Sequence, residues 1–153
     1  MWRITLDLAD EIIIPGQLET VFVSLIDPEV LKSCIPGCEE LEKTSDTDFT
    51  AKVVLKIGPV KARFSGAVSL DISHAPHHLS LSGAGDGGLA GFAKGGADVE
   101  LVDQGDETLL RYRATAETGG KIAQLGARLI ESTAKKLSKT FFNNFEKIMI
   151  GEE

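Results

Sequence analysis

Residues 120–150 have the sequence GKIAQLGARLIESTAKKLSKTFFNNFEKIMI, and this stretch decides the fold of the chain. Its apolar residues return every three or four positions, which is the period of an amphipathic helix. The apolar stripe consists of Ile122, Leu125, Leu129, Leu137, Phe141, Phe145 and Ile148. The pattern predicts one helix of roughly eight turns, about 45 Å long. Gly126 and Ala134 interrupt the stripe with small side chains, and we expect room beneath them.

The chain before this helix mostly alternates apolar and polar residues, which is typical of strands with one buried face. The first strand begins with Trp2 and runs to Ile14. The clearest hairpin joins residues 49–57 to residues 60–72 through the turn at residues 58–59. Further strands are expected around residues 40–44, 78–85, 91–102 and 108–117.

One strand has an irregular pattern. Phe92 has an even number, whereas other apolar residues of the same strand, such as Ala97 and Val99, have odd numbers. Successive side chains of a strand point to opposite faces, so a bulge or bend at Gly95 and Gly96 is needed to bring these residues to one face. Such bends let a sheet curl strongly.

Two short helices are expected after the first strand. Apolar residues at helical spacing indicate the first helix over residues 21–26. The second should begin at Asp27, whose carboxylate can cap free N–H groups, with Pro28 at the first helical position. Pro36 and Gly37 should end it.

The order of elements is therefore strand, two short helices, six strands and one long helix, which is an α+β arrangement. One helix can cover a sheet of about seven strands only if the antiparallel sheet curves strongly around it. Side chains rarely fill all the space between a curved sheet and a single helix, so we expect an internal apolar cavity. The length of 153 residues suits one domain, residues 1–153.

The candidate cavity residues are large apolar and aromatic side chains on the faces that should turn inward. They are Phe49, Phe64, Phe92, Tyr112, Leu125, Leu129, Phe141 and Phe145. Pockets for apolar ligands are lined by such residues, although the same side chains also suit an ordinary packed core.

Charge and hydropathy narrow the possible partners. The net charge is −7 and the 16 Lys and Arg residues are scattered, so no continuous basic face for nucleic acid is expected. No apolar stretch approaches the about 20 residues that a membrane span needs, and the start lacks the pattern of a signal peptide. We expect a soluble, cytoplasmic protein that could still contact the inner face of the cell membrane transiently.

Six blocks of sequence carry a family resemblance. They are DPEVL (27–31), CIPGCEEL (34–41), IGPVKA (57–62), GFAKG (91–95), GGKIAQLG (119–126) and FF (141–142). Together they resemble the CoxG family, the G subunits of carbon monoxide dehydrogenase. The resemblance implies the helix-grip fold of START-like and Bet v 1-like proteins, which agrees with the architecture predicted from periodicity.

The resemblance also implies a role. CoxG proteins accompany molybdenum hydroxylases such as carbon monoxide dehydrogenase as accessory rather than catalytic proteins. The leading expectation is a protein without a covalently bound cofactor that carries an apolar ligand, such as a quinone or lipid. The alternatives are maturation, assembly or membrane recruitment through surface loops. Some members carry a C-terminal extension that could anchor them, whereas this chain ends at Glu153, so permanent anchoring is not expected.

The loop that follows the second short helix is the candidate contact for a partner. Its residues Cys34, Pro36, Gly37 and Cys38 lie between expected regular elements, and loops held by a rigid scaffold commonly carry recognition.

The two cysteines allow other interpretations. Cys34 and Cys38 could bind zinc together with His74, His77 and His78, they could form a disulfide, or they could be unused thiols. The C-x-x-x-C spacing is loose and the histidines lie in a separate turn, so we predict no metal site.

Gly83, Gly85 and Gly88 match the G-x-G-x-x-G spacing of a dinucleotide-binding turn. That motif needs a helix directly after it, and here a strand is expected, so bends in a curved sheet are the preferred interpretation. Asp10 and Glu11 interrupt the first strand and are either edge charges or polar groups of the cavity.

The sequence contains no arrangement of Ser, His and Asp, of Cys and His, or of paired acids that is typical of a catalytic site. We therefore expect no enzyme, while a cyclase-like reaction in the same cavity stays as an alternative, because proteins of this fold include cyclases.

Overall fold

The computed structural model describes residues 3–151, so the predicted positions of Trp2 and Glu153 lie outside the described residues. Seven antiparallel strands form one sheet in the order β1-β7-β6-β5-β4-β3-β2. The strands are β1 (Arg3–Pro15), β2 (Cys38–Lys43), β3 (Asp48–Ile57), β4 (Val60–Asp71), β5 (His78–Asp86), β6 (Phe92–Gln104) and β7 (Glu107–Gly119). The predicted strands are all present.

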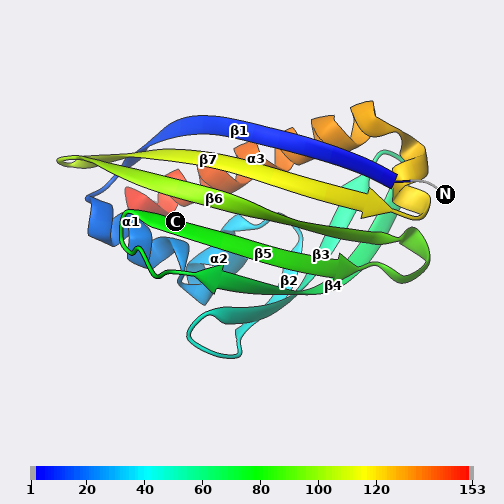
Figure 1. Cartoon of the computed structure of the whole chain (residues 1–153), viewed down its shortest axis with the longest axis horizontal. Coiled ribbons are helices and arrows are strands. Elements are labelled where there is room, and N and C mark those ends of the chain that lie inside the picture. Colours follow the sequence, from blue (N-terminus) through cyan, green and yellow to red (C-terminus); the bar gives the residue numbers. More distant parts are fainter. Residues whose placement is uncertain (1–2, 152–153) are drawn as a thin grey trace.

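Helices cover one face of this sheet. The α-helices are α1 (Leu18–Leu25), α2 (Pro28–Cys34) and α3 (Ala127–Met149), and two short 3-10 helices are η1 (Gly88–Ala90) and η2 (Lys121–Leu125). Figure 1 shows α3 running along the sheet, with α1 and α2 beside its C-terminal end. The two short helices after the first strand and the curved sheet around one long helix are confirmed.

The long helix starts later than the sequence indicated. We predicted helix from Gly120 onward, but η2 and a break at Gly126 precede α3. Gly126 has φ 98° and ψ 153°, a left-handed conformation that favours glycine. The helix therefore has 23 residues, which gives a length of about 35 Å.

The predicted bend at Gly95 and Gly96 is wrong. β6 pairs with β5 and β7 in an unbroken register that includes both glycines. Phe92 consequently lies on the face opposite to Ala97, where its ring covers Gly119 of β7 and leaves no room for a Cβ there. The register shift lies instead in β2, between Cys38 and Glu40.

Several contacts fix α2 and the loop after it. The Asp27 carboxylate accepts a hydrogen bond from the Glu29 N–H at 2.9 Å, which confirms the predicted N-cap. At the other end of α2, Asn144 Nδ2 of α3 donates to the Cys34 carbonyl at 3.1 Å. Gly37 has φ 78°, and a Cβ at this position would overlap the Val54 carbonyl of β3. The loop can approach β3 this closely because its residue is glycine.

The interior contains two separate groups of buried apolar residues. The first lies where α1, α2 and the end of α3 meet the sheet, and it comprises Ile14, Leu18, Val21, Phe22, Cys34, Leu79, Leu101, Leu110 and Phe145. The second lies near η2 and comprises Ile57, Phe64 and Ile122. The core is therefore divided along the length of α3.

The N-cap of α2 leads to a stability prediction. Replacing Asp27 with Ala should lower the free energy of unfolding by about 1 kcal/mol, because two N–H groups of the first turn lose their acceptor. Urea unfolding followed by circular dichroism measures the change. Asp46→Ala is the control, since Asp46 is an exposed loop residue. Equal stability of the two variants would contradict the capping role.

Candidate ligand cavity

A cavity of about 490 Å³ lies between α3 and the sheet. This volume is within the range of about 300–1,000 Å³ that is typical of small-molecule sites. Its wall comprises Leu25, Leu31, Ile35, Pro36, Leu41, Phe49, Ala51, Val53, Leu55, Val68, Leu70, Leu79, Leu81, Ala97, Val99, Leu110, Tyr112, Ala114, Leu137, Ser138, Phe141 and Phe142. Among the described residues on this wall, only Tyr112 and Ser138 have polar side-chain atoms.

The position of the cavity follows from the divided core. Leu79 and Leu110 of the wall belong to the first buried group, and Leu55 packs against the second. Strands β3 to β7 provide the floor through residues of alternating position, and α3 lies above it. The segment from α1 to the loop after α2 closes one side with Leu25 and Pro36.

Three of the eight candidate cavity residues lie on this wall, namely Phe49, Tyr112 and Phe141. They come from β3, β7 and α3, so elements far apart in the sequence meet here.

The other five candidates lie elsewhere. Phe64, Leu125 and Leu129 belong to or pack against the second buried group, because β4 points Phe64 toward Ile122 of η2. Phe145 is 0% exposed in the first group and stacks on Phe141, with ring centroids 6.2 Å apart. Phe92 lies on the opposite face of the sheet, as described above. Alternation identifies the inner face of a strand but not the position along it where the cavity lies.

Phe142 is a cavity residue that was not predicted from the sequence. Its ring stacks on Tyr112 at a centroid distance of 5.5 Å and meets Phe141 edge-on at 5.0 Å. Its position next to Phe141 could have indicated this place on the wall. Adjacent residues of a helix are rotated by about 100° about the helix axis, so both can border a wide hollow.

The expected room beneath Gly126 and Ala134 is not where the cavity lies. From α3, the cavity wall takes Leu137, Ser138, Phe141 and Phe142. The hollow thus lies against the C-terminal half of the helix, because side chains of the second buried group occupy the space near its start.

Two crevices border the cavity on either side of α3. The β1/α3 crevice, of about 610 Å³, shares Tyr112, Ser138 and Phe142 with the cavity wall. The β3/α3 crevice, of about 530 Å³, shares Pro36, Leu55 and Leu137 with it.

The acidic pair in β1 divides between the two faces of the sheet. Asp10 is paired in register with Tyr112 and lines the β1/α3 crevice. Glu11 points the other way, and one of its carboxylate oxygens lies 3.4 Å from Arg111 Nε. Only Asp10 is therefore placed near the cavity.

The proposed partner loop is also part of the cavity. Pro36 lies on the cavity wall, while Gly37 borders the β3/α3 crevice. Cys34 is fully buried, and burial raises the pKa of its thiol to about 11. Burial also raises the pKa of the Cys38 thiol, although the charge of Lys32 opposes the shift. The Cys38 thiol donates a hydrogen bond to the Glu40 carbonyl at 3.4 Å.

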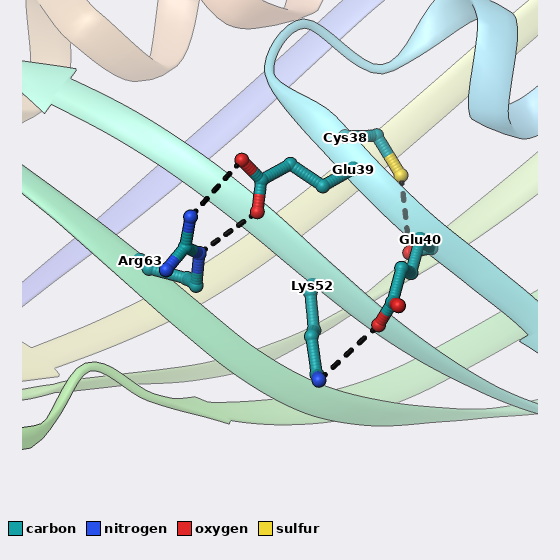
Figure 2. A network of polar contacts seen from close by, with 5 residues as sticks. All are labelled: Cys38, Glu39, Glu40, Lys52 and Arg63. Carbon is teal, nitrogen blue, oxygen red and sulfur yellow. Dashed lines mark hydrogen bonds and ion pairs between the residues drawn. The ribbon is translucent and has the colours of Figure 1, made fainter.

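Ion pairs hold the strand that follows this loop. Figure 2 shows Glu39 meeting Arg63 of β4 and Glu40 meeting Lys52 of β3, with Cys38 beside them. The Glu39–Arg63 contact has two hydrogen bonds, of 2.8 and 3.2 Å. Glu39 is the residue skipped in the register between β2 and β3, so its side chain ties the irregular end of β2 to the sheet.

The cysteines and histidines do not combine into one site. Both thiols are free, and across residues 3–151 no three His, Cys, Asp or Glu side chains are grouped in a way that could hold a metal ion. The rings of His74 and His78 meet edge-on with centroids 6.3 Å apart, and His78 Nε2 lies 3.6 Å from Asp98.

The glycine motif lies within the sheet. Gly83 and Gly85 are residues of β5, and Gly88 begins the three-residue η1, which leads directly into β6. A dinucleotide turn needs the N-terminus of a following helix to hold the pyrophosphate. The short η1 does not provide this arrangement.

Comparison with known families assigns the chain. Residues 11–150 match the family described as the G subunit of carbon monoxide dehydrogenase (CoxG).

This chain belongs to the CoxG family.

The match spans both walls of the cavity and the loop after α2. The comparison with curated proteins gave no match.

Solved structures show which fold the chain shares. A conserved protein from Geobacillus kaustophilus is 31% identical, with a TM-score of 0.88 and 95% of each chain covered. A START superfamily protein from Mycobacterium smegmatis is 13% identical, with a TM-score of 0.72 over 94% of this chain and 96% of its own. The Zhui aromatase/cyclase from Streptomcyes sp. R1128 is 9% identical, with a TM-score of 0.68 over 97% and 99%. This CoxG protein therefore has the helix-grip, START-like fold that its sequence resemblance implied.

In the part of the chain that the structure describes, no helix combines the length and the apolar character needed to cross a membrane.

The buried thiol gives a test of the loop geometry. In a Cys38→Ser variant, iodoacetamide at pH 8 should modify Cys34 at least about 100-fold more slowly in the native than in the urea-unfolded protein. The reason is that a pKa of about 11 keeps the thiolate fraction low, and full burial keeps the reagent away from the sulfur. Mass spectrometry follows the reaction.

The raised pKa of Cys34 predicts how the stability of the folded protein changes with pH. Above the ordinary thiol pKa of 9.0, the unfolded chain loses a proton that folded Cys34 retains up to about pH 11, so stability should fall as the pH rises through this window. A Cys34→Ala variant, which can itself be less stable at neutral pH, should lose less stability over this pH range.

The labelling experiment has a contradicting outcome. Rapid labelling of Cys34 in the native protein would show that the loop opens.

Proposed function

We propose that this CoxG protein is a non-catalytic accessory protein of a molybdenum hydroxylase of the carbon monoxide dehydrogenase type. In this proposal, residues 1–153 act as one START-like domain that binds an apolar molecule, such as a quinone or lipid, and carries or presents it to the enzyme. The observation that carries the proposal is the cavity of about 490 Å³ between α3 and the sheet, with its almost wholly apolar wall.

The wall favours an apolar guest for energetic reasons. Each buried methylene group contributes about 0.8 kcal/mol, so a chain of ten would contribute about 8 kcal/mol before the entropic cost of association. Aliphatic side chains surround the hollow on the sheet side, and Phe49, Phe141 and Phe142 provide aromatic surfaces. A ring with an isoprenoid or acyl tail matches both kinds of surface.

The same wall argues against catalysis. Of the described residues that line the cavity, none is an acid, a histidine or a lysine. General acid–base chemistry needs a titratable group within reach of the reacting atoms, and Tyr112 is the only such group among the described residues of the wall. A fold shared with an aromatase/cyclase permits chemistry in this hollow, but the side chains of this chain favour carriage.

The partner follows from the family description, which names carbon monoxide dehydrogenase. We place the ligand exchange in the cytoplasm, with transient contact at the inner face of the cell membrane where apolar molecules are collected. The alternative is an assembly or recruitment factor acting through the loop at Pro36, Gly37 and Cys38. The predicted contact Cys34 is fully buried at the end of α2 and does not reach this surface. A variant that fills the cavity and leaves the outer surface intact separates the two roles.

The cavity offers such a variant. Ala97 and Ala114 face each other across β6 and β7 on the wall, so A97L/A114L places two larger side chains in the hollow. Ala67 and Ala84 face each other across β4 and β5 and are exposed, so A67L/A84L is the matched control. We expect A97L/A114L to bind 1,6-diphenylhexatriene at least about tenfold more weakly than the control, since its binding volume is occupied.

A second experiment measures carbon monoxide oxidation in cells of the host organism. Cells that carry A97L/A114L should lose carbon monoxide oxidation, whereas cells that carry A67L/A84L should retain it. Circular dichroism checks that both variants fold. Full oxidation with the filled cavity would overturn carriage and favour the assembly role. Native mass spectrometry of protein from its own host should reveal a bound hydrophobic species in the wild type.

A further inference from the structure

The two polar side chains of the cavity wall lie on one side of it. Tyr112 and Ser138 both also line the β1/α3 crevice. The residues shared with the β3/α3 crevice, by contrast, are Pro36, Leu55 and Leu137. The cavity therefore meets a polar boundary on the β1 side and an apolar boundary on the β3 side.

The hydroxyl groups at this boundary are available to a ligand. Ser33 and Ser132 donate to carbonyls of their own helices at 3.0 and 3.2 Å. Within residues 3–151, neither the Ser138 hydroxyl nor the Tyr112 hydroxyl has a hydrogen-bond partner in the protein. The Tyr112 ring is held by its stacking on Phe142, so its hydroxyl has a fixed position from which to donate a hydrogen bond.

Charged side chains surround the outer part of the β1/α3 crevice. Its acids are Asp7, Asp10, Glu131 and Glu146, and its basic residues are Lys135 and Lys139. Lys135 is already paired with Glu131, at 3.1 Å. Asp7 lies on the face of β1 opposite to Asp10, so Asp10 and Glu146 are left against Lys139, which makes the crevice unfavourable for an anion. In the β3/α3 crevice the charged residues are instead Lys56 and Lys136.

We infer that the ligand is an amphiphile whose tail fills the cavity and whose uncharged hydrogen-bonding head lies at the β1/α3 crevice. Tyr112 and Ser138 bind the head, and Asp10 with its neighbouring acids excludes an anionic one. This inference rests on the proposed function, and it adds the orientation of the ligand and the class of its head. A carbonyl or hydroxyl oxygen accepts from the Tyr112 hydroxyl, whereas a carboxylate or phosphate there faces the acids.

The test compares three probes on the delipidated chain at pH 8. Diphenylhexatriene has no head, dodecanol has an uncharged head, and dodecanoate has an anionic head on a chain of similar length. Fluorescence titration gives the affinity of the first, and displacement gives those of the other two. We expect dodecanol to bind at least about fivefold more tightly than dodecanoate.

Variants assign the preference to named groups. Tyr112→Phe keeps the ring on Phe142 and removes the hydroxyl, so it should weaken dodecanol by about three- to tenfold relative to diphenylhexatriene, which has no head to lose a hydrogen bond. Asp10→Asn should tighten dodecanoate by about two- to fivefold. Asp46→Asn, an exposed loop change of the same kind, should alter neither.

The outcomes separate the two claims. Failure of diphenylhexatriene to bind overturns the proposed function, and the inference with it. If the headless probe binds but dodecanoate equals or exceeds dodecanol, or if Tyr112→Phe and Asp10→Asn behave as wild type, the inference alone is wrong. Loss of dodecanoate binding in K56A/K136A would place the head at the opposite crevice.

Discussion

The packing of one straight helix against a strongly curved sheet is the constraint on which the rest of this molecule depends. A helix of 23 residues can fill the concave face only where large side chains reach it. Phe145 does so near the C-terminal end of α3, and Phe64 with Ile122 does so near the start. Between these two groups the surfaces separate, and an apolar hollow of about 490 Å³ is left. The division of the core thus creates the site and also holds it open.

The segment inserted between β1 and β2 completes this arrangement. Without α1, α2 and the following loop, the hollow would lack the side formed by Leu25 and Pro36. Three local devices keep the segment in place: the Asp27 cap, the Asn144 bond to Cys34, and the approach of Gly37 to β3. The family block CIPGCEEL therefore combines a wall of the cavity with a surface loop, so the proposed ligand binding and the proposed partner contact would involve the same few residues.

Periodicity predicted the strands, the first short helix and a sheet curved around one long helix, since these depend on which face of each element is apolar. The capping signals of Asp27 and Pro28 predicted the second short helix. Periodicity placed the start of the long helix too early, because the apolar repeat continues through Gly126 and does not indicate that the backbone changes direction there. It failed at Phe92, because an aromatic residue that covers a glycine on the outer face resembles a core residue out of phase. Among the aromatic candidates, Phe49 and Phe64 both point inward, yet only Phe49 borders the hollow. That distinction depends on where along the helix each strand crosses, which one sequence does not specify.

The last strand of the sheet has a consequence for behaviour in solution. β2 has the sequence CEELEK, so four of its six residues are charged, and its register is shifted beside Glu39. An unpaired strand edge is a template for pairing with other chains, and dense charge together with a bulge suppresses such pairing. If the proposed carrier role holds, the charged β2 edge would disfavour self-association of this CoxG protein both with and without its ligand.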